Sequence, residues 1–111
     1  MSRLKAIFWV DALIRRAESG LAAAYVIRRG DEDAGAVLVK VVQSRTECVL
    51  FVPIRDEEGE RLWIRFRKGQ SDEREVDDYC RERCEDDPDL WLIEIEDRQG
   101  RHFLTEPVEE L

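Results

Sequence analysis

Residues 23–42 read AAYVIRRGDEDAGAVLVKVV, and this stretch decides the fold. It holds two apolar runs, 23–27 and 36–42, separated by a polar segment with two glycines and three carboxylates. The second run is interrupted only by Lys40, which is typical of a strand that is covered on both faces and therefore central in its sheet. The polar segment 28–35 has the composition of a solvated turn. The stretch therefore predicts a β-hairpin whose loop is residues 28–35.

Two amphipathic segments outside this stretch are predicted to be helices. In the first, apolar residues recur at positions 7, 10, 14 and 17, which predicts a helix over about residues 8–18, ended by Ser19 and Gly20. Residues 4–7 fit either the first turn of this helix or a short preceding strand. The second helix is predicted to begin at Ser71, a good N-cap residue, and to stop near Glu85.

Further strands are predicted at residues 48–54, 61–67 and 90–96, with 101–104 as a short final strand. In 61–67 the alternation predicts one inward set, Leu62, Ile64 and Phe66, and one outward set, Arg61, Trp63, Arg65 and Arg67. Consecutive strands joined by short loops pair antiparallel. We therefore expect a single α+β domain over residues 1–111, in the order α-β-β-β-β-α-β. Its antiparallel sheet has about five strands, both helices pack on one face, and the tail 105–111 is frayed.

The composition limits the functional classes. The chain has 111 residues and a formal charge of −8, and most of the acid lies after residue 53. Such a surface repels phosphate backbones, so we expect no nucleic-acid binding. The sequence has no apolar run of membrane-spanning length and no secretory signal pattern, so we expect a cytoplasmic protein that does not bind membranes.

Several segments together resemble one family of small bacterial proteins, catalogued as domain of unknown function 1491. The segments that carry the resemblance are residues 9–16 (WVDALIRR), 28–41 (RRGDEDAGAVLVKV), 87–91 (DPDLW), 94–98 (EIEDR) and 101–103 (RHF). The resemblance covers most of the chain outside residues 43–76. It implies a bacterial cytosolic protein of about this length, and it implies no activity and no site residues.

The most unusual predicted surface feature is Trp63 with Arg61 and Arg65 beside it. On an outward strand face, an aromatic ring between guanidinium groups has the composition of a protein–protein hot spot. Alternatively, a helix or a second copy covers Trp63, or the arginine side chains stack on it.

A second candidate is an anion site formed by two basic pairs, Arg15–Arg16 and Arg28–Arg29, together with the 30–35 loop. Arginine forks bind carboxylate or phosphate, provided that the fold brings the pairs together. In the alternative reading, the second pair neutralises acids of its own turn. Asp31 and Asp33 have the spacing of a cation site but lack its further ligands, so a solvated turn is favoured.

Three cysteines and one histidine raise the question of a metal site. Cys48, Cys80, Cys84 and His102 total the four ligands of a structural zinc site. Cys80 and Cys84, however, lie on the apolar stripe of the second predicted helix, where free cysteine packs as a small hydrophobic residue. We expect reduced thiols and no metal, although the sequence leaves open whether the four residues converge.

No nucleophile or phosphate-binding motif is present, and no catalytic residue or cofactor is predicted. The preferred hypothesis is therefore a non-catalytic protein-interaction module that binds a protein partner or forms a homodimer, through the Trp63 face or an edge strand. The alternative is a small-anion or metabolite-binding domain, or an enzyme, that uses the arginine pairs and the glycine-flanked loop.

Overall fold

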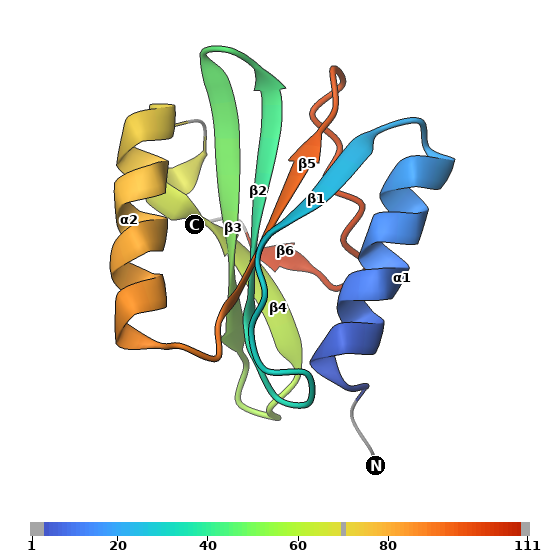
Figure 1. The fold of residues 1–111 in the computed structure, drawn as a ribbon, viewed down its shortest axis with the longest axis vertical. Coiled ribbons are helices and arrows are strands. Elements are labelled where there is room, and N and C mark those ends of the chain that lie inside the picture. Colours follow the sequence, from blue (N-terminus) through green and yellow to red (C-terminus); the bar gives the residue numbers. More distant parts are fainter. Residues whose placement is uncertain (1–3, 70, 110–111) are drawn as a thin grey trace.

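The computed structural model describes residues 4–69 and 71–109, which form one sheet with a helix on each side (Figure 1). The helices are α1 (Ala6–Ser19), the short 3-10 helix η1 (Phe66–Lys68) and α2 (Glu73–Asp86). The strands are β1 (Ala23–Arg28), β2 (Val37–Ser44), β3 (Glu47–Arg55), β4 (Arg61–Arg65), β5 (Trp91–Glu96) and β6 (Val108–Glu109).

The strand order in the sheet is β1-β5-β2-β3-β4-β6. The β2–β3 and β3–β4 pairs are antiparallel, as is β1–β5, whereas β2 pairs with β5, and β4 with β6, in parallel. The α+β class and the single sheet are therefore confirmed, and the sheet is mixed rather than purely antiparallel. The central position of β2 is also confirmed, because Leu38 and Val39 are fully buried between β5 and β3.

The predicted hairpin between β1 and β2 is wrong, because β5 lies between these two strands. The connecting loop instead packs against the start of β5. A Cβ atom added at Gly30 would lie 2.1 Å from the Asp89 carbonyl oxygen, and one added at Gly35 would lie 2.3 Å from the same atom. Both glycines are thus required by close backbone approach rather than by the geometry of a tight turn.

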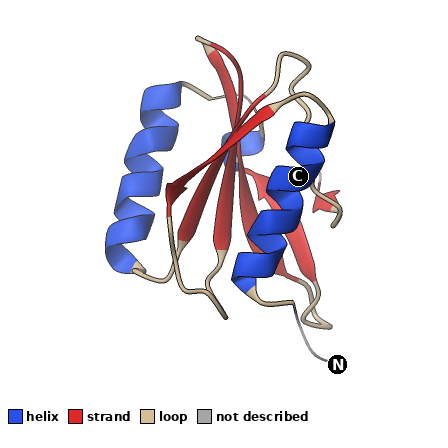
Figure 2. Cartoon of the chain, turned by 45° about the vertical axis from the view of Figure 1, so that its right-hand side comes forward, coloured by secondary structure: helices blue, strands red, loops and turns tan. Residues whose placement is uncertain are grey.

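The two helices cover opposite faces of the sheet, which corrects the prediction that both pack on one face (Figure 2). On the α1 side, Trp9 and Leu13 of the helix belong to a buried cluster with Val39 and Ile93 of the sheet. On the α2 side, the helix contributes Val76, Cys80 and Cys84. These three residues pack with Leu38, Leu50 and Leu90. Side chains alternate across a strand, so a continuous apolar run such as β2 supplies both layers.

The ends of several elements differ from the predictions; for example, the strand predicted over residues 61–67 ends at Arg65. The first helix begins at Ala6, so of the two alternatives for residues 4–7 the helical one is correct. The second helix is capped by Asp72 rather than Ser71, and Asp72 Oδ1 accepts a hydrogen bond from the Arg74 amide at 3.0 Å. Residues 101–104 form no strand, because Phe103 adopts a left-handed backbone conformation with φ of 60°. The expected frayed tail is instead paired with β4 at Val108 and Glu109, and residues 110–111 lie outside the described part.

Candidate functional site

Trp63 faces the α1 layer and is fully buried, so the sheet face predicted to expose it is part of the core. Its ring stacks on that of Trp9, with centroids 5.6 Å apart. The alternative reading, in which a helix covers Trp63, is the correct one. Arg61 and Arg65 lie over aromatic rings, Arg61 over both Trp9 and Trp63 and Arg65 over Phe51.

A carboxylate binds the edges of the two stacked indoles. The Trp9 Nε1–H donates to Glu106 Oε2 at 2.9 Å, and the Trp63 Nε1–H donates to Glu106 Oε1 at 3.0 Å. Burial alone would raise the pKa of Glu106, but the hydrogen bonds from Trp63 and Trp9 outweigh it and hold that pKa below its ordinary value. Sequence reasoning missed this site because the tail, 43 residues beyond Trp63, showed no pattern.

The predicted arginine cluster does not form. Arg16 lies in the last turn of α1, where its Nε–H donates to the Phe103 carbonyl oxygen at 2.9 Å, and Arg15 is exposed in the same part of the helix. Arg28 is the last residue of β1 and Arg29 follows it, so the second pair lies at the opposite end of this strand from the end of α1. Arg29 pairs with Glu32 of its own loop at 2.6 Å, as the alternative reading proposed.

The acidic loop between β1 and β2 closes a turn and caps a helix. Asp31 Oδ2 accepts hydrogen bonds from the amides of Asp33 and Ala34, and the Asp33 carboxylate pairs with Lys5 at 3.5 Å. The main-chain oxygens of residues 33 and 32 accept from the first two amides of α1. These contacts give both aspartates a structural role, which agrees with the solvated-turn reading.

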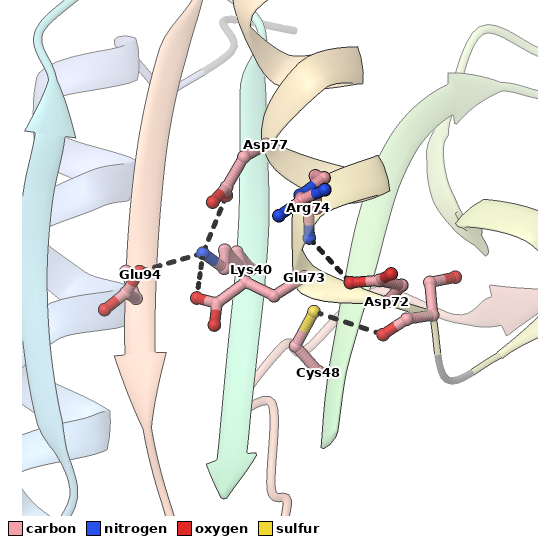
Figure 3. A network of polar contacts seen from close by, with 8 residues as sticks. Lys40, Cys48, Asp72, Glu73, Arg74, Asp77 and Glu94 are labelled. Carbon is pink, nitrogen blue, oxygen red and sulfur yellow. Dashed lines mark hydrogen bonds and ion pairs between the residues drawn. The ribbon is translucent and has the colours of Figure 1, made fainter. Parts of the chain in front are cut away.

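A second polar cluster is built on Lys40, the single interruption of the β2 run, and is shown in Figure 3. Its side chain is buried under α2, and its Nζ donates to Glu73 at 2.6 Å and to Asp77 at 2.8 Å. Glu94 of β5 lies 3.4 Å away. Burial alone would lower the pKa of Lys40, but the carboxylates, led by Asp77 and Glu73, more than offset it and raise the pKa above its ordinary value. The cluster therefore holds a charged lysine that ties α2 to the sheet.

The four candidate zinc ligands are split between the two faces. Cys48, Cys80 and Cys84 are buried in the α2 layer, whereas His102 packs edge-on against Phe51 in the α1 layer, with centroids 5.0 Å apart. Burial, with a smaller contribution from Cys84, raises the pKa of Cys80 to about 12, so this thiol is protonated at neutral pH. Within residues 4–69 and 71–109, no group of three or more His, Cys, Asp or Glu side chains is placed so that it could hold a metal ion.

His102 predicts a pH dependence of stability. Burial and the positive charge of Arg65 lower its pKa, and its Nδ1 accepts a hydrogen bond from the Leu104 amide at 2.9 Å. In the unfolded chain the imidazole of His102 has its ordinary pKa of about 6.5. The stability that depends on a neutral His102 is therefore complete above that pH, where the imidazole is neutral in both states. It is lost as the pH falls from about 6.5 through the lower pKa of the folded state.

We therefore expect the free energy of unfolding of the wild type, measured by urea titration, to fall between pH 7.5 and 5.5. It should fall less in His102→Asn, whose side-chain oxygen can still accept from Leu104. Equal slopes for the two proteins would contradict a half-buried imidazole that the fold keeps neutral.

The largest exposed apolar feature of a strand is at β1. This strand ends the sheet, so one of its edges has no neighbouring strand in the described part of the chain. Three consecutive side chains on it are exposed, at 48%, 44% and 54%: Tyr25, Val26 and Ile27. Residues 23–27 contain no charge and no proline, which are the usual means of protecting an edge strand. Unlike the Trp63 face, this edge is available to another chain.

No helix in residues 4–69 or 71–109 combines the length and the apolar character that crossing a bilayer requires.

The fold and these clusters define a small α+β protein with a mixed sheet between two helices. The model of the family described as "Protein of unknown function (DUF1491)" matches residues 4–105, and the chain belongs to this family, as the resemblance in its sequence indicated.

Solved structures of relatives have the same fold. A crystal structure of a DUF1491 family protein from Caulobacter crescentus CB15 matches with a TM-score of 0.90 at 50% identity, over 96% of this chain and 100% of that one. An NMR structure of a DUF1491 family protein from the same organism matches with a TM-score of 0.88 at 49% identity, over 99% of this chain and 100% of that one. A solution structure of a protein from A. tumefaciens matches with a TM-score of 0.79 at 28% identity, over 95% of each chain. No curated protein matches the chain.

Proposed function

We propose that the protein is a non-catalytic protein-interaction module and that its β1 edge pairs with the β1 edge of a second copy. The observation that carries the proposal is the run of three exposed apolar side chains on a six-residue edge strand whose single charged residue, Arg28, is at its end. An unpaired strand edge offers a row of backbone donors and acceptors to another strand.

A second copy suits this edge because a two-fold axis brings identical patches together. Two antiparallel β1 strands would place apolar side chains opposite one another and join two six-stranded sheets. Each copy carries a charge of −8, so long-range repulsion opposes association. Added salt screens this repulsion and should therefore strengthen the dimer.

The test is the change Val26→Lys, which puts an edge-protecting charge at the centre of the exposed run. Sedimentation equilibrium of the wild type is expected to give a concentration-dependent dimer that Val26→Lys abolishes. The stability of the variant should change by no more than about 0.5 kcal/mol, because position 26 is exposed.

The matched control is Ile54→Lys, which charges an exposed apolar residue at the end of β3 and should leave the dimer intact. A wild type that remains monomeric at high concentration and raised salt would contradict the proposal.

A further inference from the structure

The second edge of the sheet, at β4, is occupied by the protein's own tail. The Trp63 amide donates to the Pro107 carbonyl oxygen at 2.9 Å, and Val108 and Glu109 pair in parallel with Trp63 and Ile64. The added strand is only two residues long, and Pro107 has no amide to donate. The tail therefore fills the β4 edge with few backbone hydrogen bonds.

What anchors this short strand is the Glu106 carboxylate. Both of its oxygens accept from an indole, one on α1 and one on β4, at 2.9 and 3.0 Å. The Arg61 guanidinium lies 4.9 Å from the Trp9 ring centroid and 5.8 Å from that of Trp63. Two convergent donors next to a positive charge are what recognition of a carboxylate requires, and strand addition beside a side-chain pocket is a common way to bind a peptide.

An open groove of about 600 Å³ continues from this carboxylate. Trp9, Arg61 and Glu106 line it together with the apolar Leu4 and Ala6. Its lining also includes three further carboxylates, which would repel a strongly acidic ligand: Asp33, Glu58 and Glu60. A suitable ligand is therefore an extended segment with a single carboxylate, followed by small or apolar residues.

We propose that Trp9, Trp63 and Arg61 form a recognition site for one carboxylate on an extended peptide of a partner protein, and that Glu106 occupies this site in cis. The site lies at the edge of the sheet opposite β1, so it is independent of the proposed self-association. A tethered occupant competes at an effective concentration in the millimolar range. A partner peptide therefore binds weakly to the wild type and more tightly once the Glu106 contact is lost.

The experiment uses the full chain, as wild type and as Glu106→Gln, which keeps the size of the side chain and one acceptor oxygen. Each protein is titrated with a C-terminally amidated peptide of the sequence of residues 104–108 (LTEPV), whose one carboxylate is its Glu, and with a matched peptide that has Gln in that place. NMR follows the indole N–H signals of Trp9 and Trp63. The internal control is Trp91, whose indole donates to the Asp31 carbonyl oxygen and not to Glu106.

The expected result is that Glu106→Gln binds the Glu peptide at least tenfold more tightly than the wild type does, and at least tenfold more tightly than it binds the Gln peptide. The signals of Trp9 and Trp63 should move and that of Trp91 should not. Equal affinity for the two peptides, or no response of the two indoles, would overturn the proposal.

Should Glu106→Gln fail to fold, the wild type provides the test at peptide concentrations up to about 10 mM, which exceed the effective concentration of the tail. Saturable movement of the two indole signals with the Glu peptide alone would support the site. Absence of movement would overturn it.

Discussion

Replacing Trp63 with alanine is expected to lower the free energy of unfolding by about 3–5 kcal/mol, because it empties a fully buried site in the α1 layer. The change also removes the ring on which Trp9 stacks and one of the two donors to Glu106. Since a small domain has only about 5–15 kcal/mol of stability, urea or thermal unfolding will detect the loss easily.

The change Trp63→Phe separates packing from hydrogen bonding, because it keeps an aromatic ring but has no indole N–H. It should cost less than the alanine change while still weakening the tail contact. If alanine at position 63 changed the stability by no more than about 0.5 kcal/mol, as is usual for surface sites, the buried position would be contradicted.

The second large effect is expected when Lys40 loses its partners on α2. The double change Glu73→Ala and Asp77→Ala leaves a buried ammonium group with only Glu94, at 3.4 Å. Leaving a buried charge unpaired costs about 3–5 kcal/mol, and we expect the lower end because both removed carboxylates are about half exposed and water can replace them in part. The measurement is chemical denaturation of the double variant against the wild type.

The control is Lys40→Met, which fills the same space without charge. It should cost less than the double change, since the carboxylates of Glu73 and Asp77 can turn to water. Adding Lys40→Met to the double variant should recover much of its stability. If the triple variant were no more stable than the double, the lysine would not be the destabilising group.

Local patterns in the sequence were sufficient to predict most elements. Helical spacing located α1 and α2, and the apolar run located β2 as a central strand. That run also implied a layer on each side of the sheet, which is inconsistent with two helices on one face. The same oversight misplaced Trp63: alternation in β4 divides its residues into two sets correctly, but it cannot tell which set is covered when both faces are.

The insertion of β5 between β1 and β2 could not be predicted, because the pairing joins residues far apart in the sequence. Gly30 and Gly35 showed that this loop needs glycine at two positions. Glycine is favoured both by a tight turn and by close approach to the Asp89 backbone, so the two glycines did not distinguish these arrangements. The lysine cluster was partly visible, since Lys40 alone interrupts β2. Its partners on α2 are 33 and 37 residues away and were indistinguishable from other surface acids.

The most direct test of the proposed function is the distance between spin labels on two copies of the protein. All three natural cysteines are buried, so a single Val26→Cys change provides the accessible labelling site. Labels at position 26 are expected to lie close together, because adjacent strands are only about 5 Å apart. Labels at Glu109→Cys, on the opposite edge of the sheet, should be far apart. Pairing through β1 would be contradicted if only the labels at position 109 gave a short distance between copies. It would also be contradicted if neither position gave a measurable distance between copies.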